Sequence, residues 1–273
     1  MPEGDTLHAY ARAITNHLAG KPLLTAVSTR VELSRLAGQH VVLARAQGKH
    51  LLIEFDEGHI LRTHLRMHGT IRIRDGSYPG PLWNPHVRWL LSTEDKTAVC
   101  LDAPTVELLH QKQLPSHPVL SRLGPDLLDK ELDTHEILRR LRQQPYTAIG
   151  VALMDQEVMS GIGNVYKSEV LFLAGVSPFA AIAALDDARL TQIADLARQL
   201  MRRNVGARRR TTPRGRIASH YWVYRRSGEP CLRCGAGVRM QRQNPLARST
   251  YYCPECQPAL APLTDDGSTP ACN

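Results

Sequence analysis

In Cys231-Leu232-Arg233-Cys234 and Cys253-Pro254-Glu255-Cys256, two C-x2-C pairs are separated by eighteen residues. Two such pairs provide the four thiolates of a tetrahedral zinc site, because each pair can form one knuckle of a short hairpin. The spacing therefore predicts one structural Zn²⁺ held by Cys231, Cys234, Cys253 and Cys256. A redox-active pair or two disulfides is the alternative interpretation of the same pattern.

The predicted hairpin is basic, since it carries Arg239, Arg242 and Arg248. A second basic segment precedes it, with seven arginines between Arg202 and Arg216, and the chain has a net charge of +8 over 273 residues. Clustered arginines neutralise phosphates and release counterions, so this charge favours a nucleic-acid partner. Surface charge that serves solubility alone is the alternative.

Hydrophobic periodicity divides the chain into a β-rich half and a helical half. An amphipathic helix is predicted from Thr6 to Leu18, and turns then separate short strands. The predicted strands are Val41–Ala44, His50–Phe55, His59–His64, Gly69–Arg74, Val87–Ser92 and Thr97–Leu101. The predicted helices are His135–Arg142, Thr147–Met159, Val165–Ala174 and Asp186–Arg203. This order predicts an α+β fold in which a β-sandwich or barrel with a leading helix precedes a helical domain.

The chain contains no apolar run near the ~18 residues of a membrane span and no signal peptide. We therefore expect a cytoplasmic, nucleoid-associated protein with no membrane partner, and a reducing compartment favours zinc thiolates over disulfides. Cys100 lies in an apolar strand and is expected in the core. Cys272 lies in a tail, residues 258–273, that is expected to be disordered.

The first residues, Met1-Pro2-Glu3, suggest a nucleophile. Removal of Met1 would leave a secondary amine at Pro2, and an α-amino group titrates near pH ~8, well below a lysine. A secondary amine that attacks a sugar carbon gives an iminium ion, which acidifies neighbouring C–H bonds and allows phosphates to leave. Glu3 could then move the proton that the sugar oxygen requires. A plain, frayed terminus is the alternative.

Two turns carry further candidates. Ser160-Gly161-Ile162-Gly163-Asn164 joins two predicted helices, and Asn164 is expected to be the N-cap of the second, where backbone N–H groups favour a phosphate. Lys49 follows Gln47-Gly48 in a predicted hairpin turn. His64 and His68 are expected on one face of a sheet, and a metal site there is disfavoured because no glutamate follows His64.

These motifs occur together in the formamidopyrimidine-DNA glycosylase/endonuclease VIII family, which the chain resembles over nearly its whole length, to about Gln257. The resemblance implies a β-sandwich, a helix-two-turn-helix domain and a zinc finger around a DNA cleft. It implies that Pro2 is the nucleophile, Glu3 the general acid and base, and Lys49 a catalytic phosphate contact. It further implies that Asn164 and Arg248 bind phosphates and that Met67 fills the gap left in the duplex. The expected domains are residues 1–125, 126–219 and 220–257.

Departures from the family pattern favour its endonuclease VIII branch, most of all the second actinobacterial type. Gly4-Asp5-Thr6 lacks the second glutamate of the 8-oxoguanine enzymes, and no Arg-Arg-Phe segment occurs near Asp102. Glu157 replaces a usual lysine, and the segment from Arg210 to Tyr221 is short for a loop that caps an oxidised purine. The resemblance thus implies a monomeric glycosylase and abasic-site lyase that acts on oxidised pyrimidines in duplex or single-stranded DNA. A formamidopyrimidine- or 8-oxoguanine-preferring enzyme, or a non-catalytic zinc-containing DNA-binding protein, is the alternative.

Overall fold

Helix α1 (Gly4–Leu18) opens the first half of the protein in the computed structural model, which describes residues 2–76, 84–215, 219–243 and 247–259. Its apolar face holds the buried residues Leu7, Ala11, Ile14 and Leu18, as the periodicity predicts. The helix begins two residues before the predicted start at Thr6. The chain forms two compact units that divide between Arg122 and Leu123, and each is described here by itself.

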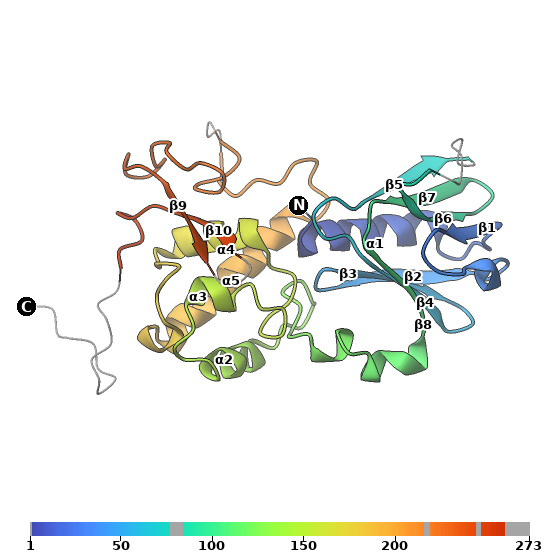
Figure 1. Ribbon diagram of the computed structural model, residues 1–273, viewed down its shortest axis with the longest axis horizontal. Helices are drawn as coiled ribbons and strands as arrows, with labels where there is room; N and C mark the ends of the chain where they lie inside the picture. The colour runs from blue at the N-terminus through green and yellow to red at the C-terminus, as the bar shows by residue number, and fades with distance from the viewer. Residues whose placement is uncertain (1, 77–83, 216–218, 244–246, 260–273) are drawn as a thin grey trace, which may run out of the picture. The chain divides into compact units, whose positions relative to one another are not determined.

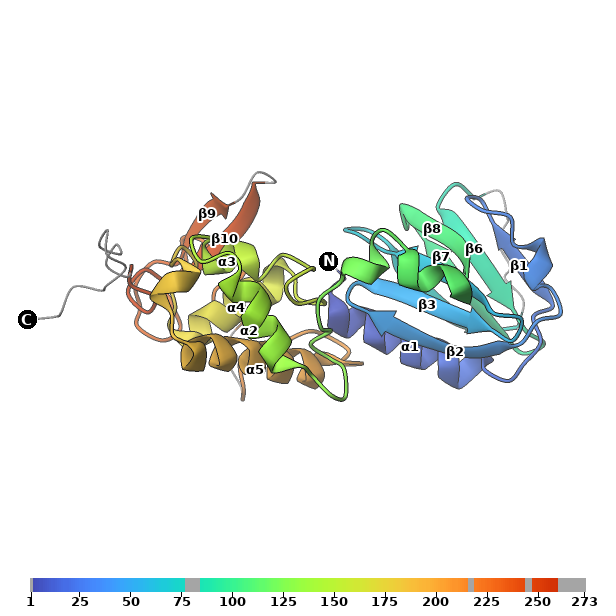
Figure 2. The same cartoon turned by 90° about the horizontal axis from the view of Figure 1, so that it is seen from below.

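The first unit is a β-sandwich. Two four-stranded antiparallel sheets have the strand orders β1-β6-β7-β5 and β2-β3-β4-β8. Figure 2 shows α1 along the second of these sheets, beside β2 and β3. The strands are β1 (Thr25–Ser28), β2 (Val41–Gln47), β3 (His50–Phe55), β4 (His59–His64), β5 (Thr70–Asp75), β6 (Val87–Ser92), β7 (Lys96–Leu101) and β8 (Thr105–His110).

The core of the first unit joins α1 to both sheets. Leu61 of β4, Trp89 of β6 and Cys100 of β7 are fully buried in it, which confirms the core position of Cys100. The Trp89 indole N–H donates to the Thr63 hydroxyl at 2.9 Å, so this buried polar atom is satisfied. Short 3₁₀ segments, Gln111–Ser116 and Leu120–Arg122, follow β8.

The second unit is helical and ends in a two-stranded hairpin. Its elements are α2 (Thr134–Arg142), α3 (Ile149–Ala152), α4 (Asn164–Ala174), α5 (Asp187–Asn204), β9 (Arg239–Gln243) and β10 (Arg248–Tyr252). Helix α4 contacts both α5 and β10, and all of its residues except Leu173 are buried (Figure 1). Gly175 ends α4 in a left-handed conformation, φ 67°, which glycine adopts without strain.

One helix prediction is wrong in extent. The segment expected as a helix from Thr147 to Met159 is helical only in α3, and the chain then turns. The prediction fails because tertiary contacts hold the turn: the backbone of Val158 passes so close to Gly124 that a Cβ there would lie 2.5 Å from the Val158 oxygen. The division into domains at residues 125, 219 and 257 stays a prediction. Most of the tail, with Cys272, lies outside the described residues.

Candidate active site and metal centre

Glu3 directly precedes α1 and is completely buried. Its backbone is extended, φ −128° and ψ −177°, and its carbonyl oxygen accepts from the N–H groups of Thr6 at 2.9 Å and Leu7 at 3.2 Å. Pro2, half-buried, is therefore held next to the first turn of a helix. A helix N-terminus is electropositive, so this is a favourable position for an acidic side chain.

Lys49 lies in the two-residue turn between β2 and β3, as predicted, and its side chain is half-buried. Gly48 makes the turn possible because its φ is +59°. The positive charge of Lys49 contributes to lowering the pKa of both His50 and His64, which places the ammonium near the two imidazoles.

A buried polar network lies beside Lys49 on one face of the sheet. Burial and the neighbouring charges lower the pKa of His50 to about 2 and that of His64 to about 4, so both rings are neutral at physiological pH. Their centroids are 4.6 Å apart. The Arg62 guanidinium donates to His50 Nδ1 at 3.2 Å and pairs with Glu107, which also contacts His117 Nε2 at 3.1 Å.

Sequence reasoning did not identify this network. The sequence contains a signal for it: Arg62 and His64 are polar residues at alternate positions of β4, and the strand register pairs His64 with His50 of β3. The β2–β3 turn that carries Lys49 thus rests on packed polar groups and not on apolar side chains alone.

Met67 lies in the turn between β4 and β5 and is 49% exposed, an unusual position for so apolar a side chain. Gly69 closes this turn by donating its N–H to the Leu65 oxygen at 2.9 Å, and a Cβ at Gly69 would lie 2.6 Å from that oxygen. His68 belongs to the turn, whereas His64 ends β4. The expectation that both histidines share a sheet face is therefore wrong, because the strand stops before His68.

Asn164 is the first residue of α4, and Gly163 is the N-cap. The prediction that Asn164 caps the helix is wrong by one position, because Asn164 already has helical geometry and its side chain bonds across to the hairpin. Its Nδ2 donates to Ser249 Oγ at 3.0 Å, while its buried Oδ1 has no hydrogen-bond partner among the described residues. Gln156 braces the preceding turn, since it accepts from Gly161 N at 3.1 Å and donates to the Ile162 oxygen at 3.1 Å.

Arg248 opens β10 opposite Gln243 of β9 and is half-buried. The residues after it are fastened to α4. The fully buried Lys167 donates from Nζ to Thr250 Oγ1 at 2.7 Å and to the Ser249 oxygen at 3.2 Å. Asn164 and Arg248 are therefore brought together through Ser249, whereas Pro2, Glu3, Lys49 and Met67 belong to the other unit.

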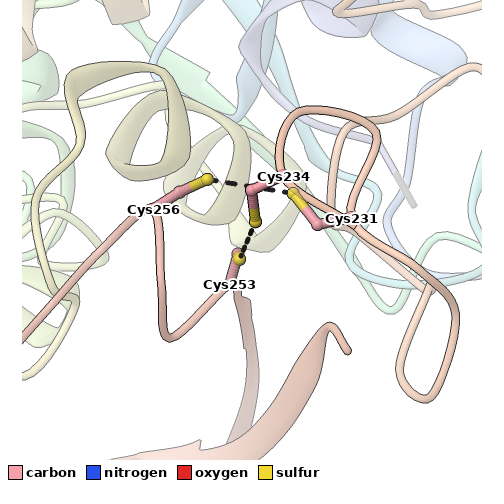
Figure 3. A group of neighbouring side chains, drawn as sticks. All are labelled: Cys231, Cys234, Cys253 and Cys256. Atoms are coloured by element: carbon pink, nitrogen blue, oxygen red, sulfur yellow. Dashed lines mark hydrogen bonds between the residues drawn. The ribbon is translucent and has the colours of Figure 1, made fainter. Parts of the chain in front are cut away.

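The four predicted cysteines converge on one point (Figure 3). Their Sγ atoms all lie within 4.8 Å of one another, with 3.9 Å between Cys231 and Cys256 and 3.5 Å between Cys234 and Cys253. Four Zn–S bonds of ~2.3 Å in a tetrahedron place the sulfurs about 3.8 Å apart. Disulfides require about 2.05 Å. The donor set fits one structural Zn²⁺ and leaves no coordination position for a substrate.

Comparison with known proteins covers both units. The family model for the formamidopyrimidine-DNA glycosylase N-terminal domain matches residues 1–105, the H2TH domain of the same glycosylase matches 123–214, and the zinc finger found in FPG and IleRS matches 228–259. The probable endonuclease 8 2 of Streptomyces coelicolor is 38% identical over 272 residues, covering 96% of each chain. The chain belongs to the formamidopyrimidine-DNA glycosylase/endonuclease VIII family. Its members are DNA glycosylases with abasic-site lyase activity, and this protein is an enzyme of that class.

Further relatives agree with this membership. The DNA-(apurinic or apyrimidinic site) lyase Nei2 of Mycolicibacterium smegmatis is 35% identical, covering 95% of this chain and all of that one, and an endonuclease 8 of Escherichia coli is 31% identical, covering 94% and 100%. Lactococcus lactis formamidopyrimidine DNA glycosylase bound to DNA with an AP site shares the fold, with a TM-score of 0.79 at 22% identity over 94% of this chain and all of that one. Among the described residues, no helix has the length and apolarity of a membrane span.

Proposed function

We propose that this glycosylase and lyase uses the amine of Pro2 to remove oxidised pyrimidines and to cleave the strand by β,δ-elimination. The amine attacks C1′ of a flipped nucleotide, loses its proton and displaces the base; the C1′–O4′ bond then breaks as O4′ is protonated, and an open-chain iminium ion forms. Loss of the C2′ proton then expels the 3′ phosphate, and a second elimination expels the 5′ phosphate. The buried Glu3 carboxylate between Pro2 and the first turn of α1 carries this proposal, because it can protonate the sugar ring oxygen.

The remaining residues have roles in binding DNA. Lys49 supplies a cation at a glycine turn, Arg248 a guanidinium at the start of β10, and Asn164 an amide at a helix N-terminus, which favours phosphate. The Asn164 NH₂ group has two hydrogens: one donates to Ser249 Oγ, and the second can donate to a phosphate oxygen. The exposed Met67 suits insertion into the base stack. The protein acts as a monomer on chromosomal DNA in the nucleoid.

Borohydride trapping tests the nucleophile. Wild-type protein with an abasic duplex should give a covalent protein–DNA adduct on a denaturing gel, and a permanent extension ahead of Pro2 should abolish it. Glu3→Gln should bind the same duplex normally but react about 10²- to 10⁴-fold more slowly, the usual contribution of a general acid. Pro2→Gly, with a primary amine, should retain some trapping. An adduct that persists in the extended protein would exclude Pro2 as the nucleophile.

A lesion panel tests the substrate preference. Duplex and single-stranded substrates with 5-hydroxyuracil, thymine glycol or 8-oxoguanine opposite cytosine should be cleaved at different rates, fastest for the pyrimidines. The missing Arg-Arg-Phe segment and the short segment from Arg210 to Tyr221 support this preference. Equal cleavage of 8-oxoguanine opposite cytosine would contradict it. Absence of turnover with every lesion, together with tight DNA binding, would instead favour the non-catalytic alternative.

A further inference from the structure

A short basic loop, residues 205–210, connects α5 to Thr211 in the second unit. It carries three successive arginines, Arg208, Arg209 and Arg210, and no aspartate or glutamate occurs from Asn204 to Gly215. Gly206 turns the chain at the end of α5 with a φ of +77°. We call residues 205–210 the arginine loop.

A single side chain closes the arginine loop. The amide of the buried Asn204 accepts from Thr211 N at 2.9 Å through Oδ1 and donates to the Thr211 oxygen at 2.9 Å through Nδ2. This pair of bonds imitates the pairing of two backbone strands and joins the two ends of the loop. Arg203 adds a bond to the Thr212 oxygen at 2.5 Å. The loop is thus ordered before any ligand arrives, which lowers the entropy cost of binding.

Helix α4 holds the loop from the other side. The Arg210 guanidinium lies 5.2 Å from the ring centroid of Tyr166, a fully buried residue of α4. Thr212, two residues further on, donates its hydroxyl to the buried carboxylate of Glu169, also on α4. The arginine loop is therefore attached to the same helix that begins with Asn164.

Two of the three arginines on this loop have no carboxylate partner within the described residues. Arg208 and Arg209 are exposed, and neither forms an ion pair within the described part of the chain. Other arginines of the same unit are paired: Arg139 and Arg140 contact Glu136, and Arg142 contacts Asp187. Exposed guanidiniums on an ordered loop match phosphate oxygens, to which they donate bidentate hydrogen bonds.

We propose that the arginine loop binds DNA backbone phosphates and that Asn204 is its positioning residue. The inference rests on the proposed function, since it extends the phosphate surface of Asn164 and Arg248 to residues of the α5–hairpin connection. Phosphate contacts carry no sequence information, so the loop contributes to affinity for any DNA and leaves the chemical step unchanged.

The salt dependence of binding tests this proposal. Each phosphate contact contributes about 0.9 to the slope of log K against log salt for duplex DNA and about 0.7 for single strands. The Arg208→Gln/Arg209→Gln variant should therefore lose about 1.8 from the duplex slope and about 1.4 from the single-strand slope. The control Arg139→Gln/Arg189→Gln removes two exposed arginines of α2 and α5 and should keep both slopes. Equal slopes for wild type and the loop variant would overturn the proposal.

Asn204→Leu tests the positioning role, because it keeps every arginine but cannot bond to Thr211. We expect the affinity to fall at least fivefold while the thermal transition of the second unit is retained; unchanged affinity would overturn the role of Asn204. Binding of an RNA of the same sequence is measured as well. Weaker RNA binding with unchanged DNA binding in the Arg208→Gln/Arg209→Gln variant would overturn the choice of DNA.

All binding is measured on a duplex with a tetrahydrofuran site, which cannot form the covalent adduct, so binding is read apart from catalysis. Borohydride trapping of the Arg208→Gln/Arg209→Gln variant on saturating abasic DNA should match wild type. If wild type gave no adduct but the slopes still differed, the proposed function would fail and the loop proposal would stand.

Discussion

Helices α1 and α4 begin alike but are buried in opposite ways. Each follows an N-cap residue with extended backbone, Glu3 or Gly163, and neither helix has a side-chain capping hydrogen bond at that residue. Helix α1 buries one apolar face against a regular sheet and leaves its other face to solvent. Helix α4 is surrounded on all sides, and its buried surface includes Asn164, Lys167, Ser168 and Glu169.

The difference follows from what each helix packs against. Strand pairing satisfies most backbone groups of a sheet, which therefore offers α1 a largely apolar surface, and burial of that surface is the main stabilising contribution. The exception is Ala44 of β2, whose N–H and carbonyl oxygen both bond to the Thr15 hydroxyl of α1. The neighbours of α4 include α5, β10 and the irregular segment around Trp222, whose backbone N–H groups donate to a side chain of α4 and not to a strand. Buried polar side chains of α4 meet those groups, since an unpaired buried donor costs about 1–3 kcal/mol. In addition to its apolar core, the second unit therefore depends on buried polar residues of α4 and on its metal, whereas packing of apolar side chains is the main contribution around α1.

Zinc removal should have the largest effect, and its effect should be confined to the second unit. Zinc binding contributes about 10–16 kcal/mol to the folding of small zinc domains, so Cys253→Ser or chelation should unfold the hairpin and separate Arg248 from α4. DNA binding should fall at least a hundredfold, while the near-ultraviolet circular dichroism of Trp89, buried in the first unit, persists. Unchanged amide exchange at Thr250 and Tyr251 after chelation would show that the hairpin does not need the metal.

Glu169→Gln should have the next largest effect. The carboxylate accepts from the backbone N–H groups of Trp222 at 2.7 Å, Val223 at 2.9 Å and Tyr224 at 2.8 Å, and from the Thr212 hydroxyl. Burial raises the pKa of Glu169, and these four donors oppose that rise. A glutamine has one acceptor oxygen, and its NH₂ would face donors. We expect a loss of about 3 kcal/mol, typical of a broken buried charge network.

Amide exchange at Val223 and Tyr224 measures that loss, with about a hundredfold faster exchange for every 2.7 kcal/mol. The matched control is Glu136→Gln on α2, a half-buried carboxylate at the surface that bonds to Arg139 and Arg140. Surface ion pairs contribute at most about 1 kcal/mol, so this change should leave the exchange of Val223 unchanged. Similar behaviour of the two variants would mean that Glu169 is no more important than a surface residue.

Periodicity predicted the elements that are stabilised mainly by apolar burial. The bounds of β3, β4 and β6 match the prediction, and α1 differs by two residues at its start. The zinc ligands were also predictable, because their spacing is a local property of the chain. The predicted helix around α3 was too long, because the turn after Ala152 is set by the close approach of Gly124 and by hydrogen bonds of the Gln156 side chain. Helical periodicity reports neither contact.

The hydrogen bonds of the buried polar residues of α4 were harder to predict. Lys167 and Glu169 are charged residues within Val165–Ala174, a run that is otherwise mostly apolar, and that contrast was the available signal. Their partners, Thr250 and the backbone from Trp222 to Tyr224, lie more than fifty residues away and could not be named from spacing. The roles of Pro2, Glu3, Lys49, Met67, Asn164 and Arg248 stay predictions.

The His50 network differs from the apolar core around α1, because it places buried polar groups in the first unit. Folding lowers the pKa of His50 to about 2 and of His64 to about 4, from the ordinary value of 6.5, chiefly by burial. The unfolded chain therefore binds protons that the folded chain excludes. The contribution of the two neutral histidines to the free energy of unfolding is fully present above pH 6.5. It is lost as the pH falls below that value, by about 1.4 kcal/mol per pH unit for each histidine.

Urea unfolding of the first unit between about pH 6 and pH 4.5 should thus show a slope of about 2.7 kcal/mol per pH unit from the two histidines. His50→Gln keeps an acceptor for Arg62 but cannot be protonated, so the slope should fall by about half. The control is His40→Gln, at an exposed side chain that contacts Asp56, and it should keep the wild-type slope. An unaltered slope in His50→Gln would mean that solvent reaches this network, and that the first unit has no polar interior comparable to the one around α4.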